Sequence, residues 1–150
     1  MLDLNVKKRI ENLLEVNTCI ARLKHSIQSG TATINFQKDR LVDENRNIKF
    51  TNRYTISKLF PDEDEVSTLK RELSNLEACD YIETIKDLRF PKRSDMRVFG
   101  RQYSGEDVFI KIRVELVSLA HASGGNYIFV MSFHFAEWKF KETDFPYRKN

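Results

Sequence analysis

The chain has 150 residues and a formal net charge of +3 at pH 7, with 41% hydrophobic and 31% charged residues. Because it holds only 5 glycines and 3 prolines, this composition excludes collagen-like and disordered chains and predicts one globular domain, residues 1–150, with a substantial core. No stretch approaches the roughly 20 apolar residues of a membrane span, and the N-terminus lacks the apolar core of a secretion signal. We therefore expect a cytoplasmic protein without a membrane partner, whose Cys19 and Cys79 stay reduced.

Two segments have the apolar spacing of amphipathic helices, in which hydrophobic residues recur every three or four positions. The first covers about residues 5–29 and is followed by Gly30, a typical residue for the left-handed position that ends a helix. The second follows Pro61, where Asp62 and Glu65 have the spacing of a capping box and the acidic run suits the positive end of a helix dipole. Metal binding by this acidic run is the weaker interpretation, since side chains crowded in one turn point in different directions.

Three later segments alternate in hydrophobicity as strands do: residues 96–103, 108–116 and 127–138. In the middle segment one set of alternate residues is aliphatic, and the interleaved set is Phe109, Lys111, Arg113 and Glu115. Residues 31–36 are a candidate short strand. The stretches 37–47 and 119–126 are expected to be loops.

The turn between the first two of these strands decides which side chains share a face. We expect a three-residue loop, Tyr103–Gly105, with glycine at the left-handed position. This register places Arg97 opposite Lys111 and keeps apolar residues together, whereas a two-residue loop would pair Arg97 with Ile112. Arg97 and Lys111 side by side fit either a bound anion or two side chains that splay into water. The second face then gathers Arg97, Phe99, Arg101, Phe109, Lys111 and Arg113.

His134 joins Lys111 on this face if the aromatic residues of the last strand, from Tyr127 to Phe135, pack together on the other side. A single histidine in a strand is more often structural. Upstream, the segment from Lys86 to Arg101 holds six cations and two acidic residues, a local positive excess that includes Arg89, Lys92 and Arg93. The histidines and cysteines lack the spacings of zinc sites, and the sequence has no phosphate-binding loop or nucleophile motif. We predict no metal and no cofactor.

Residues 96–116, "MRVFGRQYSGEDVFIKIRVEL", and 127–137, "YIFVMSFHFAE", resemble the C-terminal sheet of the RelE-like bacterial ribonuclease toxins, nearest the MqsR-type toxins. Leu76, Asp80 and Tyr81 are similar to the segment after that family's second helix. The resemblance covers roughly residues 45–138. It divides the single domain into an N-terminal helix (1–30), a toxin-like core (45–138) and a C-terminal extension (139–150).

This resemblance implies an α+β fold in which N-terminal helices pack on one face of a twisted antiparallel sheet. It also implies metal-independent cleavage of RNA, often of messenger RNA on the ribosome, and inhibition by a cognate antitoxin protein. The chain departs from the family pattern at Phe109, where the family has a tyrosine, and at His134, where it often has a lysine. Glu83 stands in place of a family lysine.

RNA cleavage without a metal requires a base for the 2′-hydroxyl, cations for the developing phosphorane charge and an acid for the leaving oxygen. We assign His134 as the acid or base and Lys111 with Arg97 as the stabilising cations. The candidate RNA-binding residues are Arg89, Lys92, Arg93, Phe99, Arg101, Phe109, Arg113 and Tyr81, with the aromatic rings stacking on unpaired bases. Two alternatives remain. One is a non-catalytic nucleic-acid or protein-binding module on the same fold, such as a phage or mobile-element inhibitor or adaptor; the other is a protein whose cations are only solvated surface.

Overall fold

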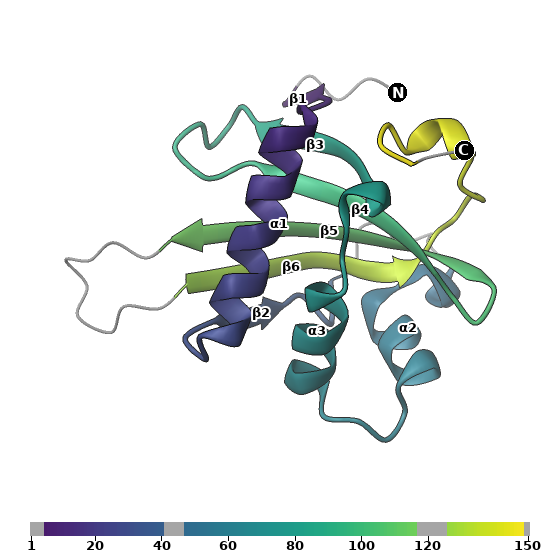
Figure 1. Cartoon of the computed structure of the whole chain (residues 1–150). Coiled ribbons are helices and arrows are strands. Elements are labelled where there is room, and N and C mark those ends of the chain that lie inside the picture. Colours follow the sequence, from purple (N-terminus) through teal and green to yellow (C-terminus); the bar gives the residue numbers. More distant parts are fainter. Residues whose placement is uncertain (1–4, 41–46, 117–125, 149–150) are drawn as a thin grey trace.

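The computed structural model describes residues 5–40, 47–116 and 126–148, which form an α+β fold with helices on one face of an open six-stranded sheet (Figure 1). This confirms the expected class and the one-sided placement of the helices. Residues 41–46 and 117–125, within or beside the two expected loops, lie outside the described residues. The strands are β1 (Val6–Arg9), β2 (Thr33–Phe36), β3 (Tyr81–Asp87), β4 (Met96–Tyr103), β5 (Glu106–Leu116) and β6 (Asn126–Phe135), and the helices are α1 (Leu13–Gln28), α2 (Asn52–Leu59) and α3 (Glu65–Ser74).

The strand order is β1-β3-β4-β5-β6-β2. Neighbouring strands are antiparallel except β2, which pairs parallel with β6, so the expectation of a purely antiparallel sheet is wrong. α1 crosses the sheet from the β1 edge to the β2 edge (Figure 1), so that β2 joins the sheet beside β6. A helix of 16 residues is about 24 Å long, close to the width of six strands that lie about 4.8 Å apart. The helix therefore delivers the chain to the far edge of the sheet.

The first helix begins later than the sequence spacing predicts, because residues 6–9 form β1 and Asn12 caps α1. The Asn12 side chain accepts a hydrogen bond from Glu15 N at 2.8 Å, and the Glu15 carboxylate accepts one from Asn12 N at 3.2 Å. This reciprocal pair is a capping box. At the other end, Gly30 has a φ of 76° and follows the helix as predicted.

The second predicted helix corresponds to α3, but its cap is a different residue. The Asp64 side chain accepts a hydrogen bond from Ser67 N at 3.0 Å, so the capping box expected between Asp62 and Glu65 is wrong. The sequence patterns did not predict α2, β1 or β3, which are short or lie in stretches without clear alternation.

Apolar side chains form clusters on both faces of the sheet. The larger cluster lies between the sheet and the helices and includes Leu23 of α1 and Phe99 of β4, which are both fully buried. The smaller one is built on Ile85, Met96 and Val98, and it lies on the opposite face because Met96 and Val98 alternate with Phe99 along β4. We call these two sides the helix-covered face and the open face. β4 therefore buries residues on both sides.

The β4–β5 hairpin has a two-residue turn, Ser104–Gly105, whose φ angles of 52° and 79° are those of a type I′ turn. This register pairs Lys111 with Val98 and places Arg97 on the helix-covered face. The expected three-residue loop, with Arg97 opposite Lys111, is therefore wrong. That expectation assumed that β4 buries only one face, whereas Phe99 fills the larger cluster and its neighbour Val98 fills the smaller one.

β6 contains a β-bulge that changes which of its residues reach the open face. Lys111 pairs with Ser132, and the register shifts at the next pair, leaving Met131 as the extra residue. Phe133 therefore belongs to the larger cluster, while Phe129 packs against the smaller one. The expectation that the aromatic residues of this strand all share one face is wrong.

Glu11 connects the start of α1 to three other parts of the chain. Its side chain is 4% exposed, and the carboxylate accepts hydrogen bonds from Arg97 Nε at 2.7 Å, from Arg97 Nη2 at 3.1 Å and from Thr84 Oγ1. Its backbone N–H donates to Tyr81 Oη at 3.0 Å, and its carbonyl accepts from the Tyr147 hydroxyl. Burial, the largest influence, opposes ionisation, but the hydrogen bonds from Arg97 and Thr84 leave the pKa of Glu11 below its usual range.

Glu11→Ala is expected to lower the free energy of unfolding by about 3 kcal/mol, because the half-buried Arg97 loses its partner. Urea denaturation at pH 7 measures this change. The control is Glu106→Ala, which removes an exposed ion pair with Lys49 and is expected to change stability by less than about 0.5 kcal/mol.

The pH dependence gives a second check. Since the pKa of Glu11 is lowered on folding, its contribution to stability is complete above its ordinary pKa and is lost as the pH falls through the folded pKa. The difference between the wild-type protein and Glu11→Ala should therefore shrink in acid. Equal effects of Glu11→Ala and Glu106→Ala at pH 7 would contradict this account.

Candidate functional site

The open face carries a pocket of about 390 Å³, where β5 begins and β6 ends. Phe109 and Lys111 of β5 lie directly beside His134 and Ser132 of β6, and all four line the pocket. Further walls come from Arg40, in the turn after β2, and from the segment that follows β6. We call this the Lys111 pocket; its lining is Arg40, Phe109, Lys111, Ser132, His134, Ala136, Glu137, Trp138, Lys139, Phe140 and Asp144.

His134 is held in one orientation by two neighbours. Its ring stacks on Phe109, with 5.4 Å between the ring centroids and 23° between the planes. Its Nδ1 lies 2.9 Å from the Phe135 carbonyl oxygen, and because a carbonyl only accepts, Nδ1 carries the proton. In the neutral ring the lone pair is then on Nε2, the atom that can act as a base. The side chain is 8% exposed.

Lys111 is a partly buried cation next to this imidazole. Burial is the largest influence on its ammonium group and lowers its pKa, and the nearby positive charges of Arg40 and Lys8 lower it further. Glu83 and Asp87 act in the opposite direction but do not cancel the effect. Such a lysine gives up a proton more readily than one in water, which suits it to acid–base chemistry as well as to charge stabilisation.

The segment after β6 forms one side of the pocket and is fastened to β5. The backbone N–H groups of Ala136 and Phe140 donate to Asp107, the first to its carbonyl at 2.9 Å and the second to its carboxylate at 2.8 Å. The Phe140 ring lies over Gly100, and Trp138 is 79% exposed. The predicted C-terminal extension therefore borders the site.

Four of the predicted site residues lie on the helix-covered face instead. Arg97 binds Glu11, and Arg101 Nη1 donates to the Asn75 carbonyl at 2.7 Å. Phe99 and Tyr81 are fully buried, so neither ring can stack on a base. The assignments of Arg97 to catalysis and of Phe99 and Tyr81 to RNA contact are therefore wrong, and Arg101 is not part of this site. Lys111, His134 and Phe109 are the predicted residues that the structure brings together.

The remaining predicted cations lie at the other end of the open face. Arg89, Lys92 and Arg93 are exposed on the connection between β3 and β4. Arg89 Nε donates to Asp87 at 3.1 Å, and the Arg93 guanidinium lies 5.4 Å from the ring centroid of Phe90. Arg113 of β5 points to the same end of the face and is buried.

Sequence reasoning missed Arg40, Trp138 and Phe140 as parts of the site. Arg40 reaches the pocket only because β2 lies next to β6, which no periodicity indicates. A signal for Phe140 was present, since a glycine inside a strand often marks a close approach by another group. Gly100 is such a residue.

Protein-family models, curated proteins and solved structures give no match to this chain. Across the described ranges, no group of three His, Cys, Asp or Glu side chains is placed to hold a metal ion. In the same residues no helix has the length and apolar character needed to cross a bilayer.

The contact between Gly100 and Phe140 can be tested with a double-mutant cycle. A Cβ atom at position 100 would lie 2.5 Å from Phe140 Cε2, so Gly100→Ala is expected to displace the ring and to cost about 1–3 kcal/mol of stability. In the Phe140→Ala background the same substitution should cost less than about 0.5 kcal/mol, because the obstructing ring is gone. Urea denaturation followed by far-ultraviolet circular dichroism measures both. The same cost in both backgrounds would show that Phe140 does not lie on Gly100.

Proposed function

We propose that this chain is a metal-independent endoribonuclease that cleaves single-stranded RNA in the Lys111 pocket. The observation that carries the proposal is that Lys111 and His134 lie on the neighbouring strands β5 and β6, at diagonal positions of the register, and line one pocket. Arg97, by contrast, pairs with Glu11 on the helix-covered face. The pocket is also large enough, at about 390 Å³, for one nucleotide-sized group.

The chemistry follows from the two groups. His134 Nε2 takes the proton of the 2′-hydroxyl, the 2′-oxygen attacks the adjacent phosphorus, and the bond to the 5′-oxygen breaks. Lys111 gives a proton to the departing 5′-oxygen, so the products are a 2′,3′-cyclic phosphate and a 5′-hydroxyl. Arg40, which also lines the pocket, takes the role predicted for Arg97, as the cation beside the phosphorane.

The biological role that we propose with this activity is that of a RelE-like toxin, nearest the MqsR-type toxins. It would act in the cytoplasm on messenger RNA, including RNA on the ribosome, and would be held inactive by a cognate antitoxin. This part of the proposal comes from the resemblance of residues 96–116 and 127–137 to that family.

A second candidate is a non-catalytic binding module that uses the same face. The observation in its favour is that Arg97 and Tyr81 lie on the helix-covered face. The pocket therefore lacks one predicted stabilising cation and one predicted RNA-binding ring. Such a module would bind RNA or a protein partner without breaking a bond.

His134→Ala and Lys111→Ala should each lower the rate of RNA cleavage about 10²–10⁴-fold, the usual contribution of a positioned acid or base. The assay uses an end-labelled mixed RNA pool with EDTA present. Lys58→Ala, an exposed cation on α2, is the matched control and should cleave like the wild-type chain. Expression of the wild-type chain should also arrest growth, and both site variants should relieve the arrest. RNA binding without any cleavage by the wild-type chain would favour the binding module.

The acid role of Lys111 predicts a specific pH profile. Because the pKa of Lys111 is lowered, cleavage should begin to decline on the alkaline side at a lower pH than an ordinary lysine would give. Lys111→Arg keeps the charge, but arginine does not release its proton. Its residual activity should be much lower than that of the wild-type chain and should lack this alkaline decline, after subtraction of spontaneous RNA hydrolysis. An unchanged decline in Lys111→Arg would assign it to another group.

A further inference from the structure

A second pocket lies on the open face, beside the Lys111 pocket and sharing no residue with it. It encloses about 560 Å³ and is lined by Arg113 of β5, by Tyr127 and Phe129 of β6, and by Lys92 and Arg93 of the β3–β4 connection, among others. Along β5, Arg113 is two residues from Lys111 and therefore about 7 Å from it on the same face. We call this the Arg113 pocket.

Arg113 is a buried guanidinium whose position is fixed before any ligand binds. The residue is 7% exposed, its Nε donates to the Ser94 carbonyl at 3.1 Å, and the group lies 5.3 Å from the ring centroid of Phe129. Its Nη1 is 3.8 Å from the Glu115 carboxylate, too far for a hydrogen bond.

The outer nitrogens of this guanidinium are reachable from the pocket. In the described part of the chain, the buried side-chain atoms that lack a hydrogen-bond partner are Glu65 Oε1 and Tyr103 Oη. Nη1 and Nη2 of Arg113 also make no hydrogen bond within the described residues, but they are not among these fully buried atoms. Both nitrogens therefore keep some surface that solvent can reach. The guanidinium therefore presents donors in the fork geometry that matches a phosphate.

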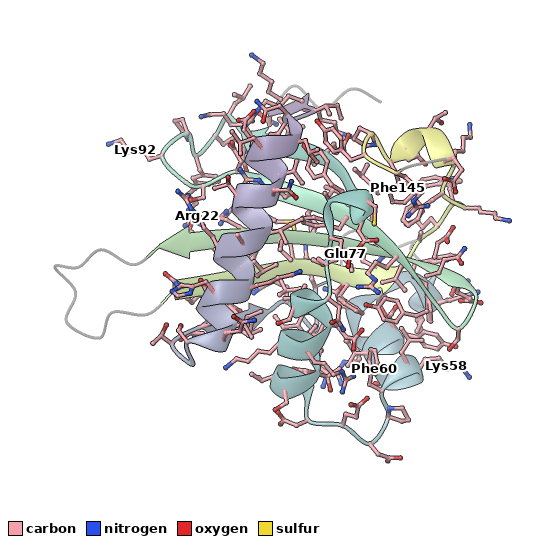
Figure 2. All side chains as sticks on the ribbon, viewed as in Figure 1. Arg22, Lys58, Phe60, Glu77, Lys92 and Phe145 are labelled. Atoms are coloured by element: carbon pink, nitrogen blue, oxygen red, sulfur yellow. The ribbon has the colours of Figure 1, made fainter. Side chains whose placement is uncertain are left out.

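The other lining groups suit the same kind of ligand. Lys92 and Arg93 add two exposed cations at the mouth, and Figure 2 shows Lys92 extending away from the β3–β4 connection. Glu115 is the one acidic residue of the lining, so positive charge prevails. The Tyr127 ring is held in place, since its hydroxyl accepts a hydrogen bond from Asn35 Nδ2, and a fixed aromatic ring is a surface on which a base of any identity can stack.

We propose that the Arg113 pocket is a second RNA subsite, in which Arg113 binds the phosphate of a nucleotide near the one in the Lys111 pocket and Tyr127 stacks on its base. Only the identification of the ligand as RNA rests on the proposed function. The pocket gives the chain a preference for single-stranded substrates long enough to reach both pockets.

The test is the binding of a fluorescent six-nucleotide 2′-O-methyl oligouridylate, which lacks the 2′-hydroxyl and cannot be cleaved. Lys92→Ala/Arg93→Ala and, separately, Arg113→Lys should each weaken binding about tenfold. In Lys92→Ala/Arg93→Ala, which removes two charges, the slope of log affinity against log salt should fall by about 0.7 for each phosphate contact that is lost. The double variant changes only exposed residues, so it decides the matter if Arg113→Lys does not fold.

The control is Arg22→Ala/Lys58→Ala, which removes the same charge from exposed positions on α1 and α2, on the other side of the sheet (Figure 2). It should bind like the wild-type chain. Affinity that is unchanged in Lys92→Ala/Arg93→Ala, or that falls equally in the control, overturns the subsite. Because the probe is not cleaved, weaker binding in the subsite variants supports the subsite even if the chain proves to have no nuclease activity. If cleavage depends on His134 but binding does not change in the subsite variants, the subsite is refuted and the proposed function is not.

Discussion

The ion pair between Glu11 and Arg97 fixes the orientation of the central strands. Glu11 is almost fully buried and binds both Nε and Nη2 of Arg97, so Arg97 must point to the helix-covered face. Successive side chains along a strand point to opposite faces of the sheet, and directly paired residues on neighbouring strands point to the same face. Once Arg97 is committed, Val98 and its partner Lys111 must point to the open face. The placement of the candidate site therefore depends on an acid that lies more than 80 residues away in the sequence.

The same pair also joins the two ends of the chain. The backbone of Glu11 is bound by Tyr81 and by Tyr147, and Tyr147 belongs to the C-terminal segment whose earlier residues border the Lys111 pocket. Tyr81 and Tyr147 also stack, with 6.1 Å between their ring centroids. The segment that follows β6 is consequently anchored at both ends, by Asp107 near the pocket and by Glu11 near the start of α1.

Sequence patterns predicted the amphipathic stripes of α1 and α3, the strands β4, β5 and β6, and the presence of Lys111 and His134 on one face. They failed where a residue's environment comes from distant parts of the chain. The hairpin register was mispredicted because Val98 and Phe99 are both apolar and both buried, on opposite faces. The position of β2 beside β6 depends on the length of α1, and the contact of Phe140 with Gly100 depends on the path of the tail. Neither is encoded in a local period.

The open face combines an apolar cluster with buried cations. Burying a cation costs free energy of folding unless negative charge or hydrogen-bond acceptors compensate it. Lys111 lies on the same face as the smaller apolar cluster, and burial lowers its pKa because it disfavours the charged form. Arg113 is buried beside the Ser94 carbonyl, the Phe129 ring and the Glu115 carboxylate. A sheet face that served only as a second core would gain stability from aliphatic residues at both positions. An anion bound across the two positions would add negative charge to that of Glu83 and Asp87, which act on Lys111, and of Glu115, which lies near Arg113. The cost of burying these two cations supports the proposal that the open face binds an anionic ligand.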